Sequence, residues 1–446
     1  MWTKYATRAP RYTSYPTAPL FSETFDPEFV ESEYRRFAER RDMSLYIHIP
    51  YCERRCLFCG CHLFISKDHH AGGPYVDRLL AEAEIIAKRV GRDHRVMQLA
   101  LGGGTPNFLL IEDMQRLIDG LRAIWEFPEE GERSIEIDVR TTDNAYMDRL
   151  LDMGFNRVSF GVQDLHPDVV SRVRKHQSQE LVEAIVSHLL ERKIQALNFD
   201  LIYGLPGQNP ERFGQTIDET IRMRPSRIAL FGYAHVPWMK SHQKVLERYG
   251  LPDEKERVQL WGIAFEKFRD AGYVPIGMDH FAEPHDELAQ SQRVGRLNRN
   301  FMGYTTARGL DLVGLGVSSI ASVGDVYVQN RKEIPPYMDD VDAGRLPWQK
   351  ALTLSTEDKM RRDLIIDLFS NFTLDAAAFE KTWNVDFWKA FAAEREKLEP
   401  LAADGLVNLG DTRIDVTPLG RFFIRNICTV FDQYLDPTTQ RFSKTV

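Results

Sequence analysis

The order of apolar and polar positions along the chain predicts an α/β protein. Short runs rich in apolar and β-branched residues alternate with longer stretches whose apolar residues recur at helical spacing. Helices are expected near 75–90 and 112–125, and between most of the other apolar runs. The runs themselves predict strands at 45–49, 96–101, 134–138, 157–161, 196–202, 227–232 and 275–278. Strands separated by helices favour right-handed crossovers, so about six such units predict a partial (βα)6-type parallel barrel.

Three short segments follow predicted strands and are expected together on one rim of this barrel. They are the cysteine-rich loop that begins at Cys52, the glycine run 102–104 and the segment 204–207. In parallel barrels the loops at the carboxyl ends of the strands hold the ligands. The sequence therefore predicts a binding site where the three segments meet.

The pattern changes after about residue 335, where proline and glycine at 334–337 and 344–347 predict a linker. Beyond it we expect a small, mostly helical, winged-helix-like domain with helices near 356–369, 387–398 and 419–434 and a hairpin at 405–416. The domains predicted are an N-terminal segment packing on the barrel (1–40), the barrel (41–335) and the C-terminal domain (350–446). The sequence of the C-terminal domain shows no basic surface pattern, which favours a packing or lid role for this domain over DNA binding.

Composition and charge mainly exclude classes of protein. The 446 residues are 43% hydrophobic and 27% charged, as is usual for a globular protein and unusual for a disordered one. No apolar run approaches the roughly 20 residues of a bilayer span, and the N-terminus has no apolar signal-peptide core. A formal charge of −8 gives no overall attraction to nucleic acid or anionic membrane. We expect a cytoplasmic monomer with neither of these partners.

Four of the five cysteines are crowded together as Cys52, Cys56, Cys59 and Cys61. An odd, crowded set is a poor disulfide framework and indicates reduced thiols. The spacing C-x3-C-x2-C-x-C on one loop suits an iron–sulfur cluster, whereas a zinc site would more usually have a second, separate pair. Three thiolates can hold three irons of a cubane cluster and leave the fourth iron open. The alternative is that all four cysteines hold one structural or electron-transfer cluster.

Cys52, Cys56 and Cys59, placed after a strand, resemble the signature of the radical S-adenosylmethionine superfamily. The resemblance implies that these three thiolates bind a [4Fe–4S] cluster and that the methionine part of S-adenosylmethionine chelates the open iron. Reduction would then release a 5′-deoxyadenosyl radical. The cofactors carry this chemistry, while the protein orients them and keeps out water and oxygen.

Further segments, in order along nearly the whole chain, are similar to the oxygen-independent coproporphyrinogen III oxidases, or coproporphyrinogen dehydrogenases. These segments are 10–18, 46–50, 102–106, 161–164, 200–204, 233–235, 277–282, 303–306, 316–318 and 425–428. The resemblance implies oxidative decarboxylation of two propionates of coproporphyrinogen III to vinyls, giving protoporphyrinogen IX in haem biosynthesis. The implied partners are a tetrapyrrole substrate and a low-potential electron donor such as flavodoxin or ferredoxin.

The same resemblance assigns cofactor contacts residue by residue. Tyr46 and Gly103 would contact a first S-adenosylmethionine, and Gly104 with Thr105 a second. Phe58 would pack on an adenine. The remaining matched positions, suited to ribose, amino-group, backbone or apolar contacts, are Glu136, Gln163, Asp200, Ala234 and Ile320.

Three positions need separate comment. Lys175 stands where the family has an arginine, which keeps the charge but loses the two-pronged fork, unless a shift by one residue brings Arg174 there. Cys61 lies too close to Cys59 to be a comfortable fourth ligand, and the resemblance, in which this cysteine marks the dehydrogenase branch, implies that it serves turnover as a catalytic residue. Arg11 is the candidate substrate clamp, because a guanidinium binds a carboxylate at two points.

Two other functions within the superfamily stay open. A haem-binding or trafficking paralogue would typically lack Cys61 and the segment 12–18, both of which are present. A radical methylase would use the second S-adenosylmethionine as a methyl donor, and the mass of the product would distinguish it.

Overall fold

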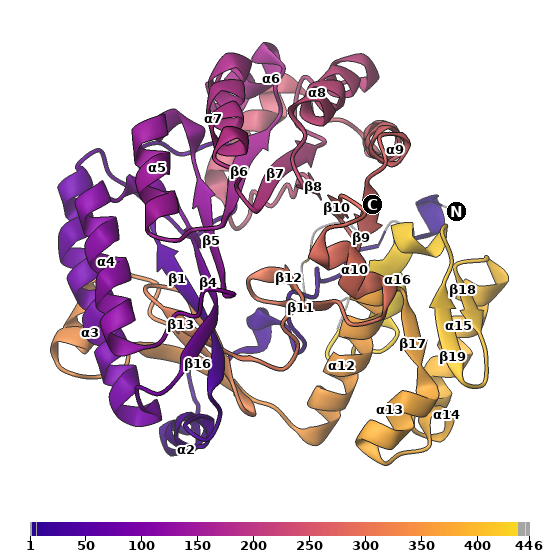
Figure 1. Cartoon of the computed structure of the whole chain (residues 1–446). Coiled ribbons are helices and arrows are strands. Elements are labelled where there is room, and N and C mark those ends of the chain that lie inside the picture. Colours follow the sequence, from indigo (N-terminus) through magenta and orange to yellow (C-terminus); the bar gives the residue numbers. More distant parts are fainter. Residues whose placement is uncertain (1, 6, 436–441, 443–446) are drawn as a thin grey trace.

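The computed structural model describes residues 2–5, 7–435 and 442 (Figure 1). In this described part the main sheet has twelve strands, and its central strands run parallel. In spatial order the parallel strands are β13 (Asp311–Leu315), β1 (Asp42–Ile49), β4 (Arg95–Gly103), β5 (Glu132–Ile137), β6 (Arg157–Gln163), β7 (Ala196–Tyr203) and β8 (Arg227–Gly232). The consecutive units from β1 to β8 confirm the predicted α/β fold.

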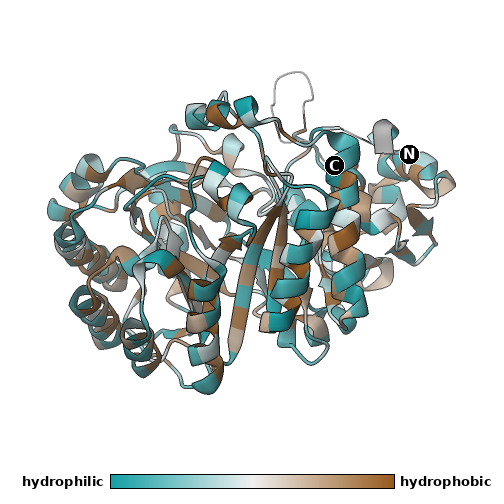
Figure 2. Cartoon of the chain, turned by 90° about the horizontal axis from the view of Figure 1, so that it is seen from above, coloured by the Kyte–Doolittle hydropathy of each residue, from teal (hydrophilic) through white to brown (hydrophobic). Residues whose placement is uncertain are grey.

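Helices cover the outer face of this curved sheet (Figure 1). Several begin at side chains that accept a backbone N–H, namely Ser178, Asn209 and Asp253, which are good N-cap residues. The covering helices are α3 (Gly72–Val90), α4 (Ile111–Ile124), α5 (Asn144–Asp152), α6 (Pro167–Arg172), α7 (Gln179–Glu191), α8 (Pro210–Met223) and α9 (Glu254–Asp270). Their apolar faces and the strands form one large core, and Figure 2 shows hydrophilic positions on the surrounding helices. None of the described helices is both long and apolar enough to cross a membrane.

Antiparallel strands extend the sheet at both edges. Beyond β13 lie β14 (Ile320–Val323), β15 (Val326–Asn330) and β16 (Trp348–Thr353), and beyond β8 lie β10 (His280–Ala282) and β9 (Val274–Ile276). The segment 334–337, predicted as linker, instead begins helix α11 (Ile334–Asp342). Pro335 and Pro336 occupy its first turn, where a missing N–H costs nothing, so the sequence signal for a linker was wrong.

The C-terminal part has its own apolar core around a small sheet ordered β17-β19-β18. Its elements are α12 (Thr356–Asn371), β17 (Thr373–Asp375), α13 (Ala376–Trp383), α14 (Phe387–Ala390), α15 (Ala392–Ala403), β18 (Val407–Leu409), β19 (Arg413–Val416) and α16 (Ile424–Thr429). The predicted hairpin is confirmed. The helix predicted over 419–434 is shorter, because Gly420 lies against the Leu406 carbonyl and the chain turns there as a 3-10 helix before α16.

The N-terminal segment, expected to pack on the barrel, has two parts. Helix α2 (Pro27–Phe37) packs against α3, β14 and β15. Tyr5, Tyr12 and Tyr15 are instead buried in the C-terminal core. Arg425 Nε donates to the Pro10 carbonyl at 3.1 Å, which ties this stretch to α16. The stretch that follows brings residues 11–13 to the mouth of the barrel.

Glu82 of α3 joins three other elements inside the fold. It is 1% exposed and accepts hydrogen bonds from the Gly316 N–H at 2.8 Å, Asn330 Nδ2 at 2.6 Å and the Tyr337 hydroxyl at 2.7 Å. The loop after β13, strand β15 and helix α11 therefore meet on one carboxylate.

We predict that Glu82→Gln lowers the free energy of unfolding by about 1–3 kcal/mol, because an amide group would face buried donors that need an acceptor. Glu84→Gln, in the same helix, removes only a partly exposed ion pair with Arg92. This change should alter the free energy of unfolding by less than about 1 kcal/mol. Chemical denaturation of the cluster-free protein measures both. Equal effects of the two changes would contradict a special role for Glu82.

Candidate active site

A chamber of about 580 Å³ opens at the carboxyl ends of the parallel strands. Strands β1, β4, β5, β6 and β7 and the loops after them supply much of its wall. The predicted site residues that line it are Arg11, Tyr46, Cys52, Cys56, Phe58, Cys59, Cys61, Gly103, Gly104, Thr105, Glu136, Gln163, Lys175 and Asp200. Residues that are far apart in the sequence are thus brought to one space, as the strand-end argument predicts.

The cysteine loop leaves β1 and is closed at its base by a short pairing of β2 (Tyr51–Cys52) with β3 (Phe64–Ile65). Cys52 Sγ lies 3.1 Å from the Thr105 hydroxyl, and Cys56 Sγ accepts from an Arg140 Nη2 at 3.7 Å. Cys59 Sγ accepts from the Cys61 backbone N–H at 3.4 Å. Each of the three thiols has its own hydrogen-bond partner, and such contacts tune the reduction potential of an iron–sulfur cluster.

Cys52, Cys56 and Cys59 all line the chamber. Among the described residues no three Cys, His, Asp or Glu side chains converge closely enough to hold a single metal ion. Burial raises the pKa of Cys52 to about 12, so this thiol is neutral until a cation binds and deprotonates it. Thiols on one loop beside a cavity fit the several irons of a cluster.

The glycine run is pressed against the end of β1. A Cβ on Gly103, whose φ is +118°, would lie 2.7 Å from the His48 ring, and one on Gly104 would lie 2.7 Å from the Tyr51 carbonyl. Only glycine fits at these two positions without moving the cysteine loop. The glycine run therefore lines the chamber, and its backbone lies directly against the backbone at the start of the cysteine loop.

Tyr46 and His48 link β1 to the cysteine loop. The Tyr46 hydroxyl lies 3.1 Å from His48 Nδ1, and His48 Nε2 lies 2.9 Å from the His62 carbonyl. Burial lowers the pKa of His48 to about 4, so the imidazole is neutral. A neutral ring that donates to His62 accepts from Tyr46, which fixes the direction of the Tyr46 hydroxyl.

Two carboxylates line the chamber, Glu136 on β5 and Asp200 on β7, and neither side chain is fully buried. Burial, followed by repulsion from Asp200, raises the pKa of Glu136 to about 7, and burial also raises the pKa of Asp200. Nearby, Gln163 Oε1 and Asn198 Oδ1 are buried and have no hydrogen-bond partner among the residues that the structure describes. Buried polar atoms are normally paired, so these carboxylates and orphaned oxygens fit a ligand with amino and hydroxyl donors, as S-adenosylmethionine has.

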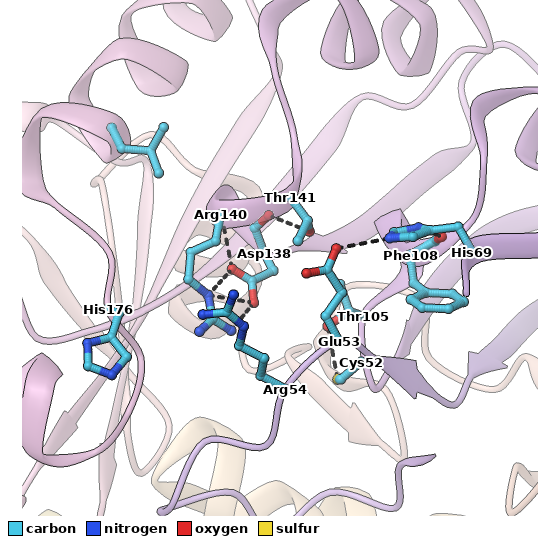
Figure 3. Close-up of a pocket in the computed structure, with 11 residues that line it drawn as sticks. Cys52, Glu53, Arg54, His69, Thr105, Phe108, Asp138, Arg140, Thr141 and His176 are labelled. Carbon is cyan, nitrogen blue, oxygen red and sulfur yellow. Dashed lines mark hydrogen bonds and ion pairs between the residues drawn. The ribbon is translucent and has the colours of Figure 1, made fainter. Parts of the chain in front are cut away.

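Cations dominate the wall near Cys56. Asp138 accepts from Arg140 Nε at 2.9 Å and lies 3.4 Å from Lys175 Nζ. Burial opposes its ionisation, but Lys175 and Arg140 outweigh burial and hold the pKa of Asp138 far below its usual value. Figure 3 shows Arg140 and Asp138 joined beside a second pocket of about 270 Å³, with Arg54 pointing toward them. Lys175 is 5% exposed and lines the chamber, whereas Arg174 is exposed.

Two predicted contacts are not part of the chamber wall. Ala234 follows β8 outside the residues that line it. Ile320 begins β14 and packs against the cluster of Phe21 and Tyr327, which also contacts Phe301. Phe301 does line the chamber, so Ile320 lies one layer behind the surface.

Several chamber residues were missed by the sequence reasoning. His280 of β10 and Arg299 of the hairpin β11 (Asn298–Asn300) and β12 (Gly303–Thr305) both line the chamber. His280 Nδ1 lies 2.7 Å from Asp279, and Arg299 donates to the Tyr304 hydroxyl at 2.9 Å. The segment 277–282, which contains His280, was matched to the family without an assigned role, whereas Arg299 lies outside every matched segment.

The partial parallel barrel with three thiols on its first loop defines a radical S-adenosylmethionine protein. The family profile described as "Radical SAM superfamily" matches residues 46–220, and "HemN C-terminal domain" matches residues 354–423. The superfamily implies a [4Fe–4S] cluster and S-adenosylmethionine.

Relatives narrow the family further. The oxygen-independent coproporphyrinogen III oxidases of Salmonella typhimurium and Escherichia coli are each 42% identical to this chain, over 99% of it and 97% of theirs. The oxygen-independent coproporphyrinogen III oxidase of Helicobacter pylori is 35% identical, over 100% of this chain and 98% of that protein. The solved Escherichia coli structure, described as coproporphyrinogen III oxidase (HemN), a radical SAM enzyme, has a TM-score of 0.92 at 41% identity and covers 95% of this chain and 98% of that one. The chain belongs to the family of oxygen-independent coproporphyrinogen III oxidases.

We predict that Arg140→Leu lowers the reduction potential of the reconstituted cluster. The change removes a positive charge and a hydrogen bond from beside Cys56, and reduction adds negative charge there. A difference of about 1 kcal/mol corresponds to roughly 40 mV for one electron. Redox titration followed by electron paramagnetic resonance measures the shift. Arg174→Leu, an exposed neighbour, should leave the potential unchanged, and an equal shift in both variants would contradict the assignment.

Proposed function

We propose that this chain converts two propionate side chains of coproporphyrinogen III to vinyl groups, giving protoporphyrinogen IX, by means of a 5′-deoxyadenosyl radical. Relatives of that name, similar over nearly the full length, support the proposal. The observation that carries it is the composition of the chamber. Thiols for a radical-generating cluster share one space with Arg11, Lys175 and Arg299, which are cations suited to a substrate with four carboxylates.

When bound, the cluster and S-adenosylmethionine would supply a radical that removes one hydrogen atom from a propionate β-carbon. Loss of carbon dioxide from that side chain, with transfer of one electron to an external one-electron acceptor, would then leave the vinyl group. The protein's part is to place the propionate and exclude water. The aromatic rings of Phe58, Phe231 and Phe301 line the chamber and suit both tasks.

The cofactor contacts divide between two molecules of S-adenosylmethionine in this proposal. Tyr46, Phe58 and Gly103 lie near the cysteine loop and would hold the first, with Glu136 available to its amino group or ribose. Gly104, Thr105, Gln163, Lys175 and Asp200 would hold the second. Asp138 carries one negative charge against the two positive charges of Arg140 and Lys175. The excess positive charge supports binding of a methionine carboxylate by Lys175.

Arg11 is the proposed clamp for a substrate carboxylate. It lies in the chamber wall and also lines a neighbouring pocket of about 690 Å³ that contains Arg8 and Arg257. One of its nitrogens donates to the Gly232 carbonyl at 2.8 Å, which fixes the guanidinium and leaves other donors for a ligand. Burial lowers its pKa, a cost that a bound carboxylate would reverse.

Anaerobic reconstitution with iron and sulfide, followed by coproporphyrinogen III, S-adenosylmethionine and a reductant, tests the function. The expected product has lost two carbon dioxide molecules and four hydrogen atoms. A product that has gained a methyl group would identify a methylase, and tight haem binding without turnover would identify a trafficking protein.

We predict that Cys61→Ser keeps the iron content and absorption spectrum of the cluster while vinyl formation falls. The bond from position 61 to Cys59 Sγ comes from the backbone N–H, which serine retains. Iron analysis and product assay of the same preparation measure both quantities. Loss of about a quarter of the iron would instead make Cys61 a ligand, because four irons share the cluster.

We predict that Lys175→Met weakens the second S-adenosylmethionine site by about 10- to 150-fold, because a charged hydrogen bond contributes about 1.5–3 kcal/mol. Lys175→Arg should tighten binding by several-fold, since it restores the fork. Calorimetric titration of the anaerobic, cluster-loaded protein gives the number and affinity of sites. Arg174→Met is the matched control and should change nothing. A single site that is unaffected at position 175 would rule out the second molecule.

A further inference from the structure

The cysteine loop has an outer face as well as the face toward the chamber. A hollow of about 430 Å³, here called the outer hollow, lies on that side and is lined by Arg55, Cys59, Ile65, Met239, Lys240 and His242, among others. Cys59 and Cys61 line both the outer hollow and the chamber. The loop is therefore a thin wall between the two spaces.

The floor of the outer hollow is fixed to the loop by hydrogen bonds. Lys240 Nζ donates to the Cys61 carbonyl at 2.9 Å, and His242 Nε2 lies 2.9 Å from the Cys59 carbonyl. Gln243 Nε2 donates to the Phe58 carbonyl at 2.9 Å. Whatever binds at the outer hollow thus contacts residues that are held directly on the cluster-binding segment.

The surroundings of the outer hollow are basic, although the whole chain has a formal charge of −8. Burial lowers the pKa of Lys332, and Lys350 and Lys240 lower it further, which places these three lysines within electrostatic reach of one another. Arg55 and Lys240 add two further positive charges in the lining of the outer hollow itself. Of the acids beside them, Glu333 lines the hollow and Glu23 is paired with Lys350 at 3.5 Å.

Exposed apolar side chains lie within this basic surround. Met239 is 69% exposed and Ile65 is 47% exposed, and both line the outer hollow. An apolar centre with a charged rim is the usual anatomy of a protein–protein interface, and a charged rim speeds the encounter with a partner of opposite charge.

The pocket beside Cys52 is the other approach to the cluster site, and it is less suited to an acidic partner. Glu53 and Asp138 are in its wall together with Arg54 and Arg140, so its charges are mixed (Figure 3). Its lining includes none of the large apolar side chains that are exposed in the described part of the chain.

We propose that the outer hollow is the docking surface of a small, acidic, low-potential electron-transfer protein that reduces the cluster. The inference rests on the proposed function, which needs one electron delivered to the cluster for each radical formed. In the docked complex the donor is oxidised by one electron and the cluster is reduced by one. The electron enters across the wall formed by the cysteine loop, opposite the chamber in which the substrate reacts.

The test compares a protein donor with a small one, using the reconstituted full chain. Formation of 5′-deoxyadenosine is measured with a reduced acidic flavodoxin and, separately, with dithionite. In Lys332→Glu/Lys350→Glu we expect kcat/KM for flavodoxin to fall at least tenfold and to lose its decrease with added salt. The rate with dithionite should stay within twofold of the wild type.

Lys381→Glu/Lys397→Glu, on exposed positions of the C-terminal part, is the matched control for the change in net charge. If the control loses as much flavodoxin-driven rate as the test variant, the proposal is wrong. If the test variant also loses dithionite-driven rate, the Met239→Ser variant provides the deciding measurement. The docking proposal requires that this variant raise the KM for flavodoxin without changing the rate with dithionite. A KM unchanged in Met239→Ser would then overturn the docking site. Because the assay measures 5′-deoxyadenosine, failure to convert coproporphyrinogen III would count against the proposed function and not against the docking surface.

Discussion

The close approach of the glycine run to the end of β1 is the constraint on which the site depends. Gly104 touches the backbone of Pro50 and Tyr51, so strand end, cysteine loop and glycine run are stacked without side chains between them. Thr105, next in the chain, is thereby within hydrogen-bond distance of Cys52. The Gly103 N–H reaches Glu136 on the adjacent strand at 3.2 Å. One steric requirement therefore positions a thiol, its hydrogen-bond partner and a carboxylate together.

Charge is distributed unevenly around the chamber. Glu136 and Asp200 line the chamber from β5 and β7, on either side of β6, while Lys175 and Arg140 crowd around Asp138. Such an arrangement costs stability in the absence of ligands, because buried charges are poorly solvated. It also orients a zwitterionic ligand, whose amino and carboxylate groups prefer opposite walls. The fold itself does not need these groups, since the apolar core lies on the other face of the sheet.

The sequence predicted most of the fold because strand and helix periodicities are local properties. The loop of thiols and the glycine run were equally readable, since each is contiguous. His280 and Arg299 were missed because His280 lies on an antiparallel addition to the main sheet and Arg299 on a separate hairpin, and no local pattern reports that either one reaches the chamber. The helix at 334–342 was missed because prolines in a first turn look like a linker. Ala234 and Ile320 were assigned by resemblance alone, and neither side chain lines the chamber.

The burial of Tyr12 and Tyr15 in the C-terminal core has a consequence for biosynthesis. Pro10 and Tyr12 contact partners that are more than four hundred positions away, namely Arg425 and Asp432. Domains generally fold in order of synthesis, and contacts between distant residues form late. The barrel can thus be complete before the segment that carries Arg11 has bound to the C-terminal part. Until α16 is made, the segment that carries Arg11 lacks the anchor that Arg425 provides.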